Sequence, residues 1–314
     1  MFAKGWTACR GLWHNAAMAH IIETAKAKIK GRGLRLVLPE ADDPRIQATA
    51  RLLHEEGLAL PLLQLAQPSA DTVQRMIAMR PSVTPAIARR LLAKPLYAAG
   101  AMVAAGMADA MLAGVAQPTY KVIEAALMTI GLADGIKTPS SFIVMQWPKR
   151  LLLFADCAVN VQPSAAQLAD IAVATAQSAA QILQDQPRVA LLSFSTLGSA
   201  KHADADKVIA ATALAKTKAP HFDFAGEMQG DAALSPEIAL RKIGVSGVAG
   251  HANVLIFPDL DAGNIAYKLC QQLGGGKAIG PILQGFSKPV SDLSRGASVD
   301  EIVATACLLL SMVD

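Results

Sequence analysis

The sequence predicts an α/β protein made of two lobes, each with a mainly parallel sheet. The chain has 314 residues, which is more than one ordinary hydrophobic core accommodates. Short apolar runs alternate with helical patterns, as is typical of parallel sheets covered by helices on both faces. The alternation breaks near Gly135, where two apolar runs, 141–145 and 151–155, follow each other across a polar turn and indicate a hairpin. We therefore expect a lobe boundary there.

Each expected element has its own local signals. A helix over 43–56 begins at Asp43-Pro44, because Asp is a preferred N-cap residue and Pro suits the first turn. Ser164 and Gln167 form the capping box of another helix. The remaining expected strands are 34–39, 60–65, 110–113, 189–193, 221–224 and 254–257. The remaining expected helices are 70–79, one from Thr84-Pro85, 96–106, 119–130, 204–217, 235–243 and 263–273, followed by a final segment, 281–312.

Composition excludes several function classes. Hydrophobic residues make up 53% and charged residues 17%, so the chain is not of the disordered type. The net charge of +4 is not gathered in a basic block, which argues against nucleic-acid binding and fits small anionic ligands. No apolar run reaches the roughly 18 residues of a membrane span. Residues 1–17 form a basic leader that is a start-site artefact, a packing arm or a targeting tag.

The cysteines indicate a reducing compartment. They show no CxxC pairing and no histidine at metal-ligand spacing, so we expect free thiols, a cytoplasmic location and no metal site. The four positions are Cys9, Cys157, Cys270 and Cys307.

The segment 285–301 is the most informative candidate site. Ser294-Arg295-Gly296 directly precedes a helix whose expected N-cap is Ser298. A helix start offers unpaired N–H groups and a positive dipole end, and an arginine fork can bind phosphate or thioester oxygens. Glu301 either closes a capping box with Ser298 or acts as a general base that accepts a thiol proton. The alternative for the whole segment is a purely structural role as an ordinary loop before a helix.

A second candidate follows the strand 189–193. Ser195, Thr196, Gly198 and Ser199 stand where open α/β sheets bind ligands, although the spacing of a phosphate-binding loop is missing. Acidic residues in 226–233 and 257–264 also follow strands, and either satisfy turns or ligate a metal.

Several long motifs spread over about 30–314 and include LVLPEADDPR, LLSFSTLGSAKH, GEMQGDAALSPE and AIGPILQGFSKPVSDLSRG. These motifs resemble phosphate acetyltransferase (phosphotransacetylase), above all its compact form associated with ethanolamine utilisation. The resemblance implies an isocitrate/isopropylmalate dehydrogenase-like architecture with an active-site cleft between two lobes. The first lobe would comprise 1–135 plus 281–314 and the second 136–280.

The resemblance also implies an activity. Family members transfer an acetyl group reversibly between coenzyme A and inorganic phosphate, with acetyl-CoA, phosphate and acetyl phosphate as substrates and products. They usually form homodimers through the second lobe and need no metal or organic cofactor.

Residue roles carry over only onto matching positions. Arg295 is expected to stabilise the acyl carbonyl and Ser294 to assist the thiolate. Glu301 stands where the family has a carboxylate, commonly Asp, proposed to deprotonate the thiol. Arg80 aligns with a phosphate-binding arginine, and Arg45 matches an arginine associated with coenzyme A. The same resemblance leaves Ser195, Thr196, Gly198 and Ser199 as substrate-binding candidates.

The sequence also departs from the family. Glu124 and Gln272 stand where arginines are expected, and the segment between Leu65 and Arg80 is shorter than usual. A carboxylate in place of a guanidinium should repel phosphate. Two alternatives therefore remain beside the acetyltransferase: a weakly active or non-catalytic acyl-CoA-binding regulatory protein, and a phosphate butyryltransferase-like enzyme.

Overall fold

The computed structural model of the chain describes residues 16–183 and 185–313. The predicted leader therefore falls largely outside the described residues, and only its last two residues belong to the first helix, α1 (Ala16–Ile29). Within the described residues no helix is long and apolar enough to cross a membrane.

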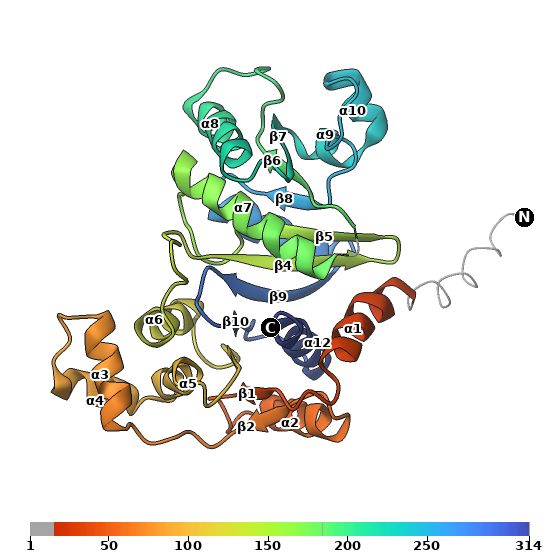
Figure 1. Cartoon of the computed structure of the whole chain (residues 1–314). Helices are drawn as coiled ribbons and strands as arrows, with labels where there is room; N and C mark the ends of the chain where they lie inside the picture. Colours follow the sequence, from red (N-terminus) through yellow and green to blue (C-terminus); the bar gives the residue numbers. More distant parts are fainter. Residues whose placement is uncertain (1–15, 184, 314) are drawn as a thin grey trace, which may run out of the picture.

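One continuous sheet of ten strands organises the structure (Figure 1). Its spatial order is β2-β1-β3-β10-β9-β4-β5-β8-β6-β7. The strands in chain order are β1 (Arg35–Val37), β2 (Leu60–Leu62), β3 (Ala110–Ala113), β4 (Ser140–Trp147), β5 (Arg150–Ala155), β6 (Arg188–Leu192), β7 (Asp223–Met228), β8 (Val254–Ile256), β9 (Lys277–Gln284) and β10 (Val290–Asp292).

The sheet is parallel at both ends and antiparallel in the middle. β1, β2, β3 and β10 pair in parallel, and so do β5, β8, β6 and β7. The two parallel groups are joined through β9 and β4, whose pairings with their neighbours are antiparallel. The predicted mainly parallel α/β architecture is confirmed. The predicted lobe boundary at 280/281 falls inside β9, and the division into 1–135 plus 281–314 and 136–280 remains a proposal.

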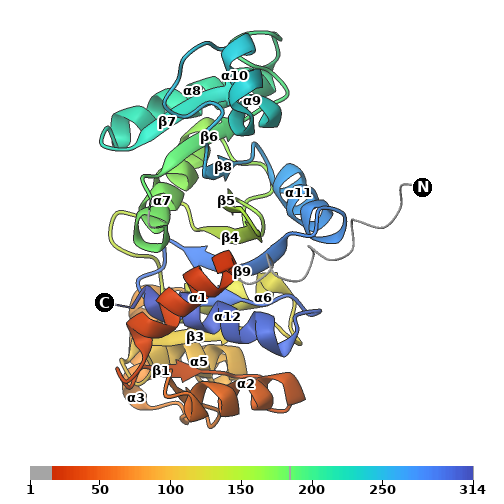
Figure 2. The same ribbon diagram turned by 90° about the vertical axis from the view of Figure 1, so that its right-hand side faces the viewer.

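Helices cover both sides of this sheet. α7 and α11 lie on opposite sides of the β4–β5–β8 region (Figure 2), while α1 packs against α12 beside β9. The other helices in chain order are α2 (Pro44–Glu55), α3 (Ala70–Met79), α4 (Pro85–Leu92), α5 (Pro95–Ala104), α6 (Thr119–Thr129), α7 (Ala165–Ile182), α8 (Ala203–Lys218), α9 (Gly230–Leu234), α10 (Pro236–Lys242), α11 (Leu260–Gln272) and α12 (Val299–Ser311).

Most of the expected elements are confirmed, and the capping signals account for them. Asp43 accepts a hydrogen bond from Arg45 N at the start of α2, and Ser164 with Gln167 forms the capping box of α7. The hairpin after Gly135 is β4–β5. β9, β10 and α9 were not separately predicted, since the final segment was left undivided and α9 has only five residues. Cys157, Cys270 and Cys307 are free thiols as expected, and Cys9 lies outside the described residues.

A close approach of backbone places α11 near the middle of the sheet. Gly263 in its first turn packs so tightly on Asp156 that a Cβ there would overlap the Asp156 carbonyl oxygen. Asn264 adds a hydrogen bond from its Nδ2 to the carbonyl oxygen of Cys157 at 3.1 Å. The small residue therefore fixes the distance of α11 from the end of β5, and with it the side chains that α11 presents further along.

Candidate active site

A cavity of about 290 Å³ lies between α11 and the beginning of α12. Ser294 and Glu301 line it from one side. Tyr267, Lys268 and Gln272 line it from α11, and Gly280 and Pro281 of β9 contribute as well. The structure thus brings two of the three predicted catalytic residues, which come from the final segment of the chain, to one cavity opposite α11.

The turn that contains Ser294 and Arg295 is exposed and short. The Ser294 carbonyl oxygen accepts a hydrogen bond from Ala297 N at 2.9 Å, and its hydroxyl oxygen accepts one from Gly296 N at 3.3 Å. The Arg295 guanidinium makes no hydrogen bond or ion pair with any residue that the structure describes, and it does not line the cavity itself. It is therefore a free cation beside the start of α12, where backbone N–H groups also favour an anion.

Arg45 fixes the backbone of this turn through hydrogen bonds. Its Nη1 donates to the carbonyl oxygens of Arg295 at 2.8 Å and Ala297 at 3.0 Å. Nη2 donates to the carbonyl oxygen of Val115 at 3.2 Å and to Asp43 Oδ2 at 2.7 Å, and Nε donates to Asp43 Oδ1 at 3.0 Å. A guanidinium has five N–H groups, so all of them are engaged within the protein. The adjacent guanidinium also lowers the pKa of Asp43.

Glu301 caps α12 as the sequence predicts. Its Oε2 accepts hydrogen bonds from Ser298 N at 2.9 Å and Ser298 Oγ at 3.1 Å, while Ser298 Oγ accepts from Glu301 N at 3.3 Å. The second oxygen, Oε1, accepts a long hydrogen bond from Gln271 Nε2 at 3.4 Å. One carboxylate oxygen is thus used by the cap and the other points toward α11, so the cap leaves an oxygen available for proton transfer.

A buried carboxyl lies directly before the turn. Asp292, the last residue of β10, is 2% exposed, and its Oδ2 accepts a hydrogen bond from Thr119 Oγ1 at 2.5 Å. Its Oδ1 has no hydrogen-bond partner among the described residues. Burial, with a smaller contribution from the Glu40 carboxylate, raises the pKa of Asp292 to about 7. Gly114 makes room for this carboxyl, because a Cβ there would overlap Oδ1.

Arg80 is not brought to the cavity. It ends α3, is exposed, and donates from Nη2 to the carbonyl oxygen of Leu127 at 3.2 Å. Leu127 is near the end of α6, whereas Thr119 beside Asp292 is its first residue. At 1.5 Å per residue these two points are about 12 Å apart along the helix. The phosphate-binding role of Arg80 remains a prediction.

The predicted substrate-binding loop after β6 is folded around a buried carboxylate. Glu227 Oε1 accepts hydrogen bonds from Ser195 Oγ at 2.7 Å and Gly198 N at 2.9 Å. Ser199 Oγ accepts from Thr196 N at 2.9 Å. None of Ser195, Thr196, Gly198 and Ser199 lines the cavity beside Ser294. Their substrate-binding role therefore remains a prediction, and the contacts that they make here organise the loop.

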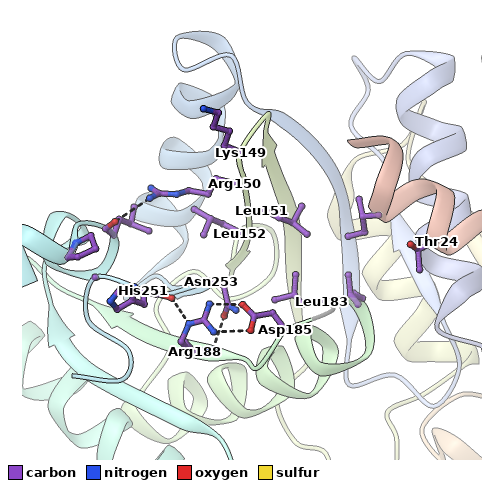
Figure 3. Close-up of a pocket in the computed structure, with 16 residues that line it drawn as sticks. Thr24, Lys149, Arg150, Leu151, Leu152, Leu183, Asp185, Arg188, His251 and Asn253 are labelled. Atoms are coloured by element: carbon purple, nitrogen blue, oxygen red, sulfur yellow. Dashed lines mark hydrogen bonds and ion pairs between the residues drawn. The ribbon is translucent and has the colours of Figure 1, made fainter. Parts of the chain in front are cut away.

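A further cavity of about 550 Å³ lies away from these residues (Figure 3). Lys149 and Arg150 at the β4–β5 turn border it, together with His251. Arg188 within it is already bound to Asp185, with Nη2 to Oδ2 at 2.7 Å. None of the predicted site residues lines this cavity. In the part of the chain that the structure describes, no group of three or more His, Cys, Asp or Glu residues could hold a metal ion.

Comparison with known proteins identifies the family. Residues 64–310 match the family model described as "Phosphate acetyl/butaryl transferase". The chain belongs to this family. It is 40% identical to a phosphate acetyltransferase of Acetivibrio thermocellus over 93% of this chain and 96% of that protein.

Solved structures of the family agree with the fold. The EutD phosphotransacetylase from Staphylococcus aureus is 34% identical with a TM-score of 0.86, covering 95% of this chain and 100% of the other. A phosphotransacetylase from Streptococcus pyogenes is 35% identical with a TM-score of 0.88, covering 95% and 99%. The resemblance inferred from the motifs is confirmed.

The two departures from the family pattern lie in different places. Gln272 lines the small cavity beside Ser294, where Lys268 is the one cationic side chain among the lining residues. Glu124 lines another cavity, of about 580 Å³, together with Lys94 and Tyr97. Burial, and secondarily the Glu124 carboxylate, raises the pKa of Tyr97 to about 12. Only the Gln272 departure therefore changes the lining of the cavity that contains Ser294.

Sequence reasoning missed the residues that position the site. Lys268 sits in an ordinary helical pattern, and only the packing of α11 shows which face it occupies. Asp292 was part of the recognised DLSRG motif but received no role. The sequence carried no signal for the burial of Asp292, because aspartates are mostly exposed and β10 has the sequence Val-Ser-Asp.

The buried Asp292 carboxyl predicts a pH-dependent stability difference. Its pKa of about 7 lies above the ordinary value of 3.8. Folding therefore favours the protonated form, and the wild-type protein loses stability as the pH rises through this interval. Asparagine does not titrate, so the free energy of unfolding of Asp292→Asn should rise relative to wild type by up to about 4 kcal/mol between roughly pH 4 and 8. Urea unfolding measures this, with the exposed Asp300→Asn as a control for charge removal. A difference that is flat across this range contradicts the assignment.

Proposed function

We propose that this chain is a phosphate acetyltransferase, which transfers an acetyl group reversibly between coenzyme A and inorganic phosphate. The observation that carries the proposal is the convergence of Ser294 and Glu301 on one cavity, next to the free Arg295 cation and the start of α12. Family membership over nearly the whole chain supports the same activity. The substrates would be acetyl-CoA and phosphate, and the products acetyl phosphate and coenzyme A.

The proposed mechanism needs one base and a cluster of positive charge. In the direction of acetyl-CoA synthesis, Glu301 Oε1 accepts the thiol proton of coenzyme A. The thiolate attacks the carbonyl carbon of acetyl phosphate, so that a C–S bond forms while the C–O bond to phosphate breaks. Negative charge that develops on the carbonyl oxygen is stabilised by Arg295, and Ser294 supports the thiolate. The proton returns from Glu301 to the departing phosphate or to water.

The finer features of the proposal rest on the family resemblance. We propose that the reaction uses no metal or organic cofactor, that the enzyme is cytoplasmic, and that the cleft divides a first lobe, 1–135 plus 281–314, from a second, 136–280. Arg45 is proposed to act here by holding the turn at Arg295 rather than by binding coenzyme A directly, since its N–H groups are all engaged.

Gln272 supports a second candidate function for the chain. A neutral amide lines the cavity where an arginine is expected from the family pattern, which lowers the positive charge available to phosphate. An acyl-CoA-binding regulatory protein with weak or no turnover is therefore the alternative, and preference for butyryl or another acyl group is a further one.

Activity measurements separate the enzyme from the regulatory protein. Acetyl phosphate formation from acetyl-CoA and phosphate, followed by thiol release, is expected for wild type and should fall by about 10²-fold or more in Arg295→Ala, because a preorganised cation for the developing oxyanion is removed. Arg241→Ala is a matched control, since Arg241 is an exposed arginine on α10 paired only with Glu237. Binding of acetyl-CoA by calorimetry, together with equal inactivity of wild type and Arg295→Ala, would establish the regulatory alternative.

Two variants distinguish the base from the cap. Glu301→Gln keeps an amide oxygen for Ser298, so stability should change little while kcat falls by roughly 10²- to 10⁴-fold. Ser298→Ala removes the cap hydroxyl, which should cost about 1 kcal/mol of unfolding free energy and leave kcat near the wild-type value. Thermal unfolding and steady-state kinetics on both proteins measure these effects. If the two variants lose activity in proportion to their stability, Glu301 is a cap only.

We also propose a homodimer through the second lobe. Four apolar side chains that follow the adjacent strands β5, β8 and β6 are each more than half exposed: Val161, Phe194, Leu197 and Ile265. Large apolar side chains left exposed beyond neighbouring strand ends support an interface there. Phe194→Asp combined with Leu197→Asp should convert a dimer to a monomer in sedimentation velocity, whereas Val245→Asp, at an exposed position elsewhere, should not. A monomeric wild type would refute the proposal.

A further inference from the structure

The Ser294–Arg295 turn is attached to α6 by a hydrogen bond between the buried Asp292 carboxyl and the half-buried Thr119 hydroxyl. We propose that Asp292 and Thr119 are positioning residues for acyl transfer, which hold the turn in register with the first turn of α6. This inference rests on the proposed function, and it adds two residues to which neither the motifs nor the family resemblance gave a role.

The contacts on both sides of Asp292 leave the turn little freedom. Asp292 Oδ2 accepts the Thr119 hydroxyl at 2.5 Å, and the next residue, Leu293, donates its backbone N–H to the carbonyl oxygen of Ala113 at 2.7 Å. Leu293 itself is buried. Ser294 is the first exposed residue after this anchored pair. A shift of the Asp292 carboxyl would therefore be transmitted over two residues to the Ser294 hydroxyl.

The Thr119 hydroxyl does not cap its own helix. Thr119 is the first residue of α6, whose N-cap, Pro118, offers no side-chain cap. The Thr119 hydroxyl donates to Asp292, which lies 173 positions away in the sequence, instead of bonding within its own helix. A hydroxyl used in this way fixes the position of α6 relative to β10 and does not stabilise the helix end by itself.

The arrangement carries a cost that a purely structural contact would avoid. Asp292 Oδ1 is buried without a hydrogen-bond partner in the described part of the chain, and the Glu40 carboxylate adds like charge nearby. Glu40 is itself bound by the backbone N–H groups of Gly114, Val115 and Ala116 at 2.6, 3.0 and 2.8 Å. An apolar side chain of similar size would fill the same space at a smaller cost in folding free energy. The presence of a carboxyl here is explained if the directed bond to Thr119 is needed at the turn.

Variants of the hydroxyl test the pair without altering a proposed catalytic residue. Thr119→Val keeps the shape of the side chain and removes the donor, so kcat for acetyl transfer should fall by roughly 10- to 100-fold with little change in the Michaelis constant for acetyl-CoA. Thr119→Ser restores a donor and should recover most of the loss. Thr129→Val is the matched control, because it removes a buried hydroxyl at the other end of α6 that bonds only Ala125 O, at 2.6 Å.

The outcomes separate this inference from the proposed function. Equal kcat for Thr119→Val, Thr129→Val and an active wild type overturns the positioning role while leaving the enzyme intact. An inactive wild type overturns the proposed function and the inference together. If Thr119→Val does not fold, Asp292→Asn provides the test, because its amide oxygen still accepts the Thr119 hydroxyl and kcat should stay well above that of Asp292→Leu. Equal losses in the two Asp292 variants contradict the inference.

Discussion

The geometry of the candidate site depends on the hydrogen bonds that the Arg45 guanidinium donates. The guanidinium joins three segments that the chain brings from distant positions: the start of α2, the connection after β3 and the turn before α12. Each N–H group has its own acceptor, and the planar fork determines where those acceptors lie. A lysine, which presents its donors from one point, could not hold the same set. Arg295 can therefore remain unpaired, because its neighbour supplies the backbone support.

The α11 wall of the cavity is positioned by a close backbone approach and one hydrogen bond. Gly263 lets α11 approach the end of β5, and Asn264 donates to the carbonyl oxygen of Cys157. The antiparallel strands β9 and β4 connect the two parallel halves of the sheet. Lys268, Gln272, Ser294 and Glu301 line one cavity in this arrangement. The reaction proposed here brings anionic groups together, and the cavity offers Lys268 with the nearby Arg295 while Gln272 contributes no charge.

Local signals in the sequence predicted much of the fold, and the motifs predicted part of the site. The sequence predicted the helix caps and the hairpin after Gly135, because each depends on neighbouring residues. The caps are at Asp43, Ser164 and Ser298. The pairing of β9 with β4 could not be predicted from the sequence, since tertiary packing decides the register between distant strands. For the same reason the motifs named Arg45 but not its acceptors, and they grouped Arg80 with Ser294, a grouping that stays a prediction because Arg80 does not line the small cavity.

Hydrogen–deuterium exchange with and without saturating coenzyme A tests directly whether the ligand binds at the small cavity, because it reports the binding site irrespective of turnover. We predict slower amide exchange in 264–273 and 294–304, the two segments that face each other across that cavity. Protection confined to 149–152 and 250–253, which border the cavity of Figure 3, would contradict it.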